Sequence, residues 1–349
     1  MSSQSQAETT ILPRRVALRP DAAARRVLVS MNPRAGSGSR HESVRAIAAA
    51  LTAAGYQVDL TTDLEELAQL SAEGSDAGDL RAVIAIGGDG TASVVRSCVP
   101  LSVPLLPVPM GTENLLGRFL GQAIDPASIC RTIDDGVTVG LDLGSANGKY
   151  FLLMISAGFD AEVIRALHEN RRGNITRIAY FLPTLRAIRS YGYPEMELYW
   201  GDAAMPNDAT RCRWVFGFNL PLYALGLPIA PRAVATDGLL DVCAFQRGST
   251  WSIVRYLWHV KRGSHHALPD ATIARCRRFR LQGPISHQIA YQLDGDYAGV
   301  LPVDVEVLPG ELRLLVSREA AQRLGFATGV GSLQHGLASQ PVSNDEYIR

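Results

Sequence analysis

One apolar run that ends abruptly in glycines constrains the fold of this chain more than any other feature. In "AVIAIGGDGTASVV" (residues 82–95), β-branched residues typical of a buried strand stop at Gly87 and Gly88, and helix-compatible residues follow. Neither glycine carries a side chain, so a ligand can approach the backbone closely. The stretch therefore predicts a strand, a tight turn and a helix, with the carboxylate of Asp89 among the glycines.

The same succession of strand and helix fills residues 25–141. Apolar runs predict strands at 25–33, 56–62, 80–88 and 104–112, and the segments between them predict helices at 39–55, 63–74 and 90–99. Strands separated by helices form a parallel sheet with helices on both faces. Because such sheets bind ligands beyond the carboxyl ends of their strands, the glycine turns lie where a ligand is expected.

A second domain, rich in β-strands, is predicted for residues 142–318. Strands are expected at 149–159, 196–200, 212–221, 239–246, 275–283, 287–296, 303–309 and 311–317, and helices at 160–168, 175–191 and 251–260. This pattern is typical of a β-sandwich or barrel. We therefore expect an α/β domain followed by a β-rich domain, with a site between them.

Composition limits the partners and the compartment. The 34 Lys and Arg residues balance the 34 Asp and Glu residues, so overall charge does not favour nucleic acid. The five cysteines have no C-x-x-C spacing, which argues against a zinc site or disulfide framework and favours a reducing, cytoplasmic setting. We find no transmembrane run, expect residues 1–24 and 324–349 to be disordered, and leave the oligomeric state open.

Three predicted turns at strand ends share one chemistry. They are "NPRAGSGSR" (residues 32–40), "GGDGT" (87–91) and "MGTEN" (110–114). A glycine after a strand is most often a plain turn, but free N–H groups at a helix start also favour a phosphate. Three such turns in one sheet favour a shared polyanion site. None has the Walker A spacing, and the first lacks the G-x-G-x-x-G pattern of dinucleotide folds.

Two interpretations of Asp89 stay open at this point. An aspartate in such a turn can cap a helix or form an Asx turn. Alternatively, the carboxylate lies beside nucleotide phosphates, which it would repel unless Mg²⁺ bridges the two.

The motifs together resemble a known family. "NPRAGSG", "GGDGT", "PVPMGTEN", "SAGFDAEV", "IAPRAVATDGLLDV" and "YQLDGDYAG" follow the order and approximate spacing of the diacylglycerol kinase catalytic-domain family, which includes sphingosine, ceramide and bacterial lipid kinases. The resemblance covers residues 26–317. It implies an α/β nucleotide-binding domain and a C-terminal β-sandwich, with the last strand often returning to the first domain. "GGDGT" alone is shared with NAD kinases.

The resemblance also assigns roles to residues. It implies that the ATP pocket is formed by Asn32, Gly36, Gly38, Gly87, Gly88, Gly90, Thr91, Gly111, Thr112 and Asn114. Asp89 and Asp142 would belong to a water-mediated Mg²⁺ network, although Asp142 could instead cap the domain junction. In some bacterial relatives the loop of Asp237 holds a structural Mg²⁺, and a turn capped by Asp237 without metal is the alternative.

The acidic pair Asp294 and Asp296 is the strongest candidate for the chemistry. A lipid hydroxyl must lose its proton when it attacks a phosphoryl group, and a carboxylate in hydrogen-bond reach can accept that proton. We expect Asp294 to be the general base and Asp296 its electrostatic neighbour. The family usually has D-G-E here, so Asp296 is one methylene shorter. A hairpin turn built on Asp-Gly is the structural alternative.

One departure from the family keeps other functions open. The third motif normally continues as Asn-Asp, but here Leu115 follows Asn114, so a metal-organising carboxylate is missing. Either Glu113 supplies the charge, or the site has fewer acids. We predict an ATP- and Mg²⁺-dependent kinase for a diacylglycerol- or sphingoid-like lipid. The alternatives are an NAD-kinase-like enzyme and a non-catalytic nucleotide- or lipid-binding protein.

The substrate side is less determined by the sequence. The segment 174–193 predicts an amphipathic basic helix, kinked at Pro183, that could dock on a bilayer or pack on a sheet. The basic segments 259–266 and 274–280 could face anionic headgroups or be solvated surface. We expect the lipid to be met at the inner, cytoplasmic face of a membrane.

Overall fold

A parallel sheet forms the first part of the chain, as expected. The computed structural model describes residues 16–31, 38–169, 191–201, 209–221, 223, 226–284 and 286–328. Four parallel strands lie in the order β2 (Gln57–Thr61), β1 (Arg26–Met31), β3 (Leu80–Gly87) and β4 (Leu105–Pro109). All of β3 after its first residue is buried, which explains its unbroken apolar run.

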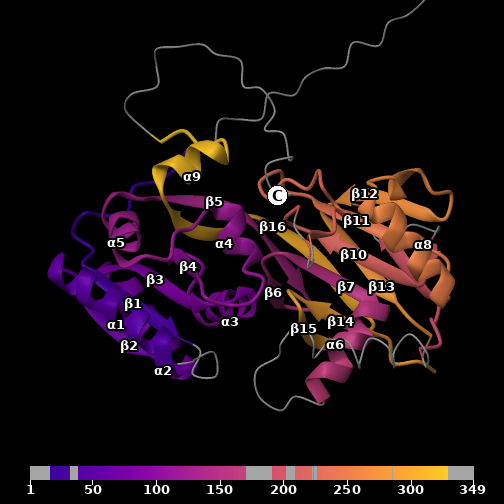
Figure 1. The fold of residues 1–349 in the computed structure, drawn as a ribbon, viewed down its shortest axis with the longest axis horizontal. Helices are drawn as coiled ribbons and strands as arrows, with labels where there is room; N and C mark the ends of the chain where they lie inside the picture. The colour runs from indigo at the N-terminus through magenta and orange to yellow at the C-terminus, as the bar shows by residue number, and fades with distance from the viewer. Residues whose placement is uncertain are drawn as a thin grey trace, which may run out of the picture.

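Helices cover both faces of this sheet (Figure 1). On one face, α1 (Gly38–Ala53) and α5 (Pro126–Asp135) share a core with Val27 and Val29 of β1. On the other, α2 (Leu64–Ala77), α3 (Asp89–Cys98) and α4 (Leu115–Leu120) share a core with Leu28. Alternate residues of one strand thus serve the two faces.

The sequence analysis missed α4 and α5. Six residues of α4 are too few to show helical periodicity. Helix α5 carried a signal that was overlooked, because Asp125 is its N-cap and Pro126 occupies its first turn.

The second half of the chain is a β-sandwich, which confirms the predicted class. One sheet has the order β12 (Ala271–Cys276), β11 (Leu240–Phe245), β10 (Trp214–Phe218), β7 (Met154–Gly158), β14 (Ala290–Leu293) and β15 (Asp296–Val300). The other contains β16 (Val303–Val316), β13 (Arg278–Gln282), β8 (Met196–Trp200), β9 (Thr210–Cys212), β5 (Val137–Ala146) and β6 (Lys149–Phe151). A separate apolar core fills the space between the sheets.

Strand β16 joins the two parts into one continuous sheet. It pairs in parallel with β4 at Leu314 and Leu105, and antiparallel with β5 along most of its length. The segments 303–309 and 311–317, expected as two strands, are therefore one strand with an irregularity between Leu308 and Leu312. Strand β5 runs across the domain boundary that we expected at residue 141.

Parts of both expected flexible ends are folded. Val16 forms a bridge with Ala327, and Leu18 forms one with Thr138 of β5. Helix α9 (Arg318–Arg323) precedes the buried Phe326, and Ala17, between the two bridging residues, is also buried. Residues 1–15 and 329–349 lie outside the described residues.

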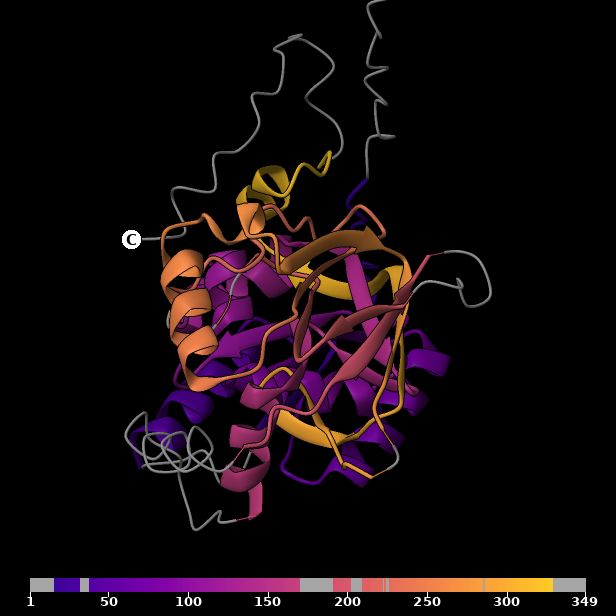
Figure 2. The ribbon, with the colours of Figure 1, turned by 90° about the vertical axis from the view of Figure 1, so that its right-hand side faces the viewer.

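Two predicted helices of the second half are confirmed. Helix α6 (Phe159–Glu169) and helix α8 (Thr250–Lys261) both lie on the side of the molecule that faces the viewer in Figure 2. The expected helix at 175–191 falls almost entirely outside the described residues. Among the helices that the structure describes, none is both long and apolar enough to cross a bilayer.

Candidate functional site

The second and third glycine turns touch each other. Met110 N donates to Gly87 O at 2.8 Å, which places the turn after β4 beside the turn after β3. A Cβ atom added to Gly111 would lie 2.4 Å from the Cα of Gly88, so only glycine allows this backbone contact. Asn114 closes the third turn, because its Oδ1 accepts from Gly111 N at 2.7 Å and its Nδ2 donates to Gly111 O at 2.9 Å.

The start of α3 packs against the same turn. Gly88 is the N-cap of α3, and a Cβ atom on Gly87 would lie 2.3 Å from Thr91 Oγ1. Thr112, in the third glycine turn, is exposed. In the first glycine turn, residues 32–37, including Asn32 and Gly36, lie outside the described residues. Gly38 is the first residue of α1.

Asp89 caps a helix, the first of the two interpretations left open above. Its Oδ2 accepts from Leu115 N and its Oδ1 from Leu116 N, both at 2.9 Å, at the start of α4. Burial raises the pKa of the Asp89 carboxyl, and the two backbone N–H groups act in the opposite direction. Both oxygens of Asp89 therefore already have backbone donors.

Leu115, at the position where the family usually has a carboxylate, packs in the apolar core. Leu115 and Leu116 are buried in the core that α3 and α4 share with the sheet. Glu113 lies close enough that its charge adds to the effect of burial in raising the pKa of Asp89. An acidic group thus remains beside Asp89, supplied by Glu113.

The turn between β14 and β15 is an Asp-Gly hairpin turn and also holds a partly buried acid. Asp294 has φ +50° and Gly295 has φ +90°, as a type I′ turn requires. The carboxylate of Asp294 accepts from Leu152 N at 2.7 Å, Leu153 N at 2.8 Å and Met154 N at 3.0 Å. Burial nevertheless raises the pKa of Asp294 to about 6.

This acid turn, residues 294–296, rests on the first turns of α3. Ser93 Oγ donates to Asp294 Oδ2 at 2.5 Å, a contact between residues 201 positions apart in the sequence. Asp296 is exposed, and its Oδ2 lies 2.7 Å from where a Cβ atom on Gly90 would be. The two predicted acids therefore both meet α3, Asp296 at Gly90 within the glycine turn and Asp294 at Ser93, beyond the end of that turn.

A chain of buried polar groups supports the acid turn from behind. Gln292 Oε1 accepts from Gly295 N at 2.7 Å, and Gln292 Nε2 donates to Ser156 Oγ at 2.7 Å. Ser156 in turn donates to Asp160, whose other oxygen accepts from Trp214 Nε1 at 2.7 Å. Gln292 and Ser156 are almost fully buried, so this chain fixes the turn relative to β7 and α6.

Asp142 and Asp237 lie at a different place. Asp142 is fully buried in β5, and its two oxygens accept from Gly238 N at 2.7 Å and Gly310 N at 3.0 Å. Asp142 thus ties the 237–238 loop to β16, in keeping with the alternative of a cap at the domain junction. Asp237 accepts from Leu239 N at 3.0 Å and pairs with Arg275.

These contacts bear on whether the residues fit a divalent metal. Within the described part of the chain, no three His, Cys, Asp or Glu residues gather in a way that could hold a metal ion. The guanidinium of Arg275 pairs with the carboxylate of Asp237, so the negative charge of Asp237 is balanced without a metal ion. Near the acid turn, the buried Asn219 Oδ1 has no protein partner. Direct ligation of a divalent metal by a cluster of such side chains is therefore not a feature of the described residues.

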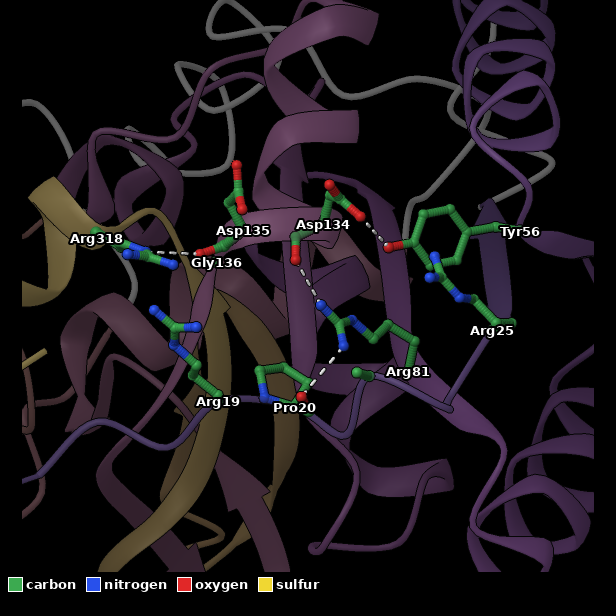
Figure 3. A pocket seen from close by; sticks show the side chains of 10 residues that line it. Arg19, Pro20, Arg25, Tyr56, Arg81, Asp134, Asp135, Gly136 and Arg318 are labelled. Carbon is green, nitrogen blue, oxygen red and sulfur yellow. Dashed lines mark hydrogen bonds between the residues drawn. The ribbon is translucent and has the colours of Figure 1, made fainter. Parts of the chain in front are cut away.

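A pocket of about 140 Å³ lies elsewhere, at the opposite edge of the parallel sheet (Figure 3). It is formed where β1 and β3 begin and where β16 ends, and its lining includes Arg19, Arg25 and Arg318. Arg81 at its floor donates to the carbonyl oxygens of residues 20, 21, 133 and 134, so its charge holds backbone segments together. The pocket therefore lies apart from the glycine turns and the acid turn.

Four residues around the site had been missed by the sequence analysis: Ser93, Ser156, Asn219 and Gln292. Gln292 and Ser156 lie inside motifs that carried the family resemblance, which was the available signal. Ser93 and Asn219 gave no local signal, because their partners are far away in the sequence.

Comparison with known proteins agrees with this arrangement. Residues 26–146 match the diacylglycerol kinase catalytic domain family, and residues 153–316 match the YegS C-terminal NAD kinase beta sandwich-like domain family. The chain is 28% identical over 307 residues to a diacylglycerol kinase of Mycobacterium tuberculosis (strain ATCC 25618 / H37Rv), covering 84% of this chain and 96% of that protein. It is 27% identical over 251 residues to a diacylglycerol kinase of Bacillus subtilis (strain 168), covering 69% and 80%.

Two further similarities concern family and fold. Over 224 residues the chain is 30% identical to the Pseudomonas fluorescens protein named "Probable lipid kinase YegS-like", covering 59% of this chain and 69% of that protein. The crystal structure of a diacylglycerol kinase from Bacillus anthracis superposes with a TM-score of 0.60 at 19% identity, covering 85% and 98%, and supports the fold. The matched domains and these relatives show that the chain belongs to the diacylglycerol kinase catalytic-domain family, a family of lipid kinases.

Proposed function

We propose that this protein is an ATP- and Mg²⁺-dependent kinase that phosphorylates the hydroxyl group of a diacylglycerol-like membrane lipid. The observation that carries the proposal is the contact of the acid turn with α3. Asp294 binds Ser93, and Asp296 lies over Gly90, directly beside the glycine turn. A group that accepts a proton and a turn suited to phosphates are thus brought together by the fold.

The glycine turns are proposed to bind the phosphates. Gly88 and Gly111 expose main chain that no Cβ atom shields, and Gly88 is the N-cap of α3. The partial positive charge at a helix start favours an anion there. Asp89 contributes by holding α4, and with it Asn114 and the third turn, against the second turn.

Asp294 is proposed as the general base. The lipid hydroxyl oxygen forms a bond to the γ-phosphorus, and the bond from that phosphorus to the β–γ bridging oxygen breaks, so ADP leaves. The hydroxyl proton passes to Asp294, where Ser93 Oγ marks a position from which a hydroxyl donates to Oδ2. A base with a pKa of about 6 is ionised at neutral pH and can accept this proton.

Mg²⁺ would neutralise phosphate charge between the glycine turns and the acids. Asp89, Glu113 and Asp296 are the acidic groups nearest to the turns, and they would act on the ion through water molecules. We place the reaction at a membrane surface, since the names of relatives specify diacylglycerol, a bilayer lipid.

The proposal is tested by incubating purified protein with γ-labelled ATP, Mg²⁺ and, separately, diacylglycerol, a sphingoid base, ceramide and NAD, followed by identification of the labelled products. We expect labelled lipid, with diacylglycerol the best acceptor. Label found only in NAD would overturn the lipid assignment. ATP binding without transfer to any acceptor would favour the non-catalytic alternative, for which Leu115 is the motivating residue.

Gln292 provides a separate prediction about the support of the acid turn. Replacing Gln292 by leucine removes the acceptor of Gly295 N, and we expect kcat to fall by about fivefold, because one hydrogen bond contributes on the order of 1 kcal/mol. The KM for ATP should change little, since Gln292 does not touch the glycine turns. Steady-state kinetics of Gln292→Leu check this. The matched control is Ser156→Ala, which keeps the hydrogen bond from Gly295 N to Gln292 Oε1.

The comparison of kcat between Gln292→Leu and Ser156→Ala decides the outcome. A Gln292→Leu enzyme whose kcat equals that of Ser156→Ala would contradict a positioning role through Gly295. Equal losses in kcat and in thermal stability for the two variants would point to core packing alone.

A further inference from the structure

Helix α8 exposes a row of large apolar side chains that the fold does not use. Trp251, Val254 and Trp258 are 83%, 53% and 51% exposed. Their spacing of three and four residues places them on one face of the helix. The opposite face is fully used, because Ile253, Tyr256 and Val260 are buried in the core, and Tyr256 stacks on Phe245 with ring centroids 4.3 Å apart.

Two exposed tryptophans on one helix indicate a surface that binds another molecule or a membrane. An indole ring has a large apolar body and one N–H donor, which suits the boundary between lipid headgroups and acyl chains. Trp258 also carries the guanidinium of Arg262 over its ring, with Cζ 4.1 Å from the centroid. That pairing places a cation and an aromatic ring at the same edge of the exposed row.

The stretch of sequence that contains α8 carries positive charges only. From Val242 to Pro269 the sequence contains no Asp or Glu, but it contains Arg247, Arg255, Lys261 and Arg262. The first acid beyond this stretch, Asp270, is buried and pairs with Arg247 and Arg255. Lys261 and Arg262 are exposed at the end of the helix, so the surface beside the tryptophans is cationic.

We propose that the exposed face of α8, formed by Trp251, Val254, Trp258, Lys261 and Arg262, docks on a bilayer containing anionic phospholipids. The apolar row would enter the boundary beneath the headgroups, and the two cations would contact headgroup phosphates. The inference extends the proposed function by naming the surface that brings the enzyme to its lipid, and it rests on that function only for this purpose.

A second copy of this chain is a poorer occupant than a bilayer. In a twofold dimer the same patch meets itself, which would bring Lys261 and Arg262 close to their own copies. Like charges across an interface oppose association. Anionic headgroups, by contrast, complement these residues, as the absence of acids from Val242 to Pro269 suggests.

The proposal is tested by sedimentation of the full chain with vesicles of phosphatidylcholine alone or with phosphatidylglycerol. We expect binding to the anionic vesicles, weakened by salt, and a loss of at least about tenfold in affinity for the double variant Trp251→Ala/Trp258→Ala. The matched control is Ile124→Ala, which removes an exposed apolar side chain from the first domain and should bind normally. A Lys261→Glu/Arg262→Glu variant should lose the preference for anionic vesicles.

Activity measurements separate this proposal from the proposed function. With a short-chain, water-soluble diacylglycerol, the tryptophan variant should match the wild type, and with vesicle-embedded diacylglycerol it should be slower. No activity on either substrate in the wild type would contradict the kinase assignment while leaving vesicle binding as a separate result. Unchanged vesicle binding by the tryptophan variant at an unchanged melting temperature would overturn the docking proposal, as would loss of a dimer without loss of vesicle binding.

Discussion

Replacing Asp294 by asparagine is expected to reduce phosphoryl transfer to lipid by between about a hundredfold and ten-thousandfold, the range that general-base catalysis supplies. An amide of nearly the same shape cannot accept the hydroxyl proton. Measurement of kcat with diacylglycerol tests this, and Asp296→Asn, which leaves the base in place, should lose less. Transfer by Asp294→Asn at a near-normal rate would exclude the base role.

The fold needs a separate control in this variant. Asp294 accepts from three backbone N–H groups and from Ser93, so asparagine also places an amide where a carboxylate accepted hydrogen bonds. We expect a lower melting temperature. ATP affinity, measured by calorimetry below that temperature, should stay close to the wild-type value, which distinguishes a lost base from a lost fold.

The pH dependence of the wild type follows from the same carboxyl. Burial raises the pKa of Asp294 to about 6, and the base must be ionised to act. The value of kcat/KM should therefore be level above pH 7 and fall about tenfold per pH unit well below pH 6. Because the hydrogen bond from Ser93 lowers this pKa, Ser93→Ala should move the falling limb to higher pH. A limb that does not move would mean that another group titrates.

The second large effect is expected at the contact of the two glycine turns. In Gly111→Ala, the new methyl group would lie 2.4 Å from Gly88 Cα, and backbone cannot move aside as a flexible side chain can. The turns must separate, and a displacement of about 1 Å can cost about a hundredfold in rate. We expect that loss in kcat/KM for ATP.

A matched glycine shows whether this loss is specific. Gly192 has no atom within 4 Å of an added Cβ and does not have positive φ, so Gly192→Ala should be nearly neutral. Equal ATP kinetics in Gly111→Ala and wild type would show that the contact of the turns is not needed for nucleotide binding.

The sequence was informative where the signal is local. An apolar run followed by Gly87 and Gly88 predicts a buried strand and a turn, because only glycine fits where backbones touch. The Asp294–Gly295 pair likewise predicts a hairpin turn from its conformational preference alone. The alternation of strands and helices was sufficient for the parallel sheet, whose strands were all expected.

What could not be predicted depends on partners distant along the chain. Asp89 caps α4, a helix too short for its periodicity to be recognised, so its backbone donors were not foreseen. Asp142 accepts a hydrogen bond from Gly310 N, 168 positions away, and no local sequence pattern predicts that contact. The continuous strand β16 was divided at residues 309–310 because Pro and Gly suggest a turn, whereas pairing with β5 carries the strand through an irregularity.

The most direct test of the account is a crystal structure of the full chain with Mg²⁺ and a non-hydrolysable ATP analogue. The account predicts that the phosphates lie against the backbone of Gly87–Thr91 and Gly111, with the γ-phosphate beside Asp296 and within reach of a hydroxyl that also contacts Asp294. A nucleotide bound at any other place on the protein, with the acid turn far from its phosphates, would contradict it.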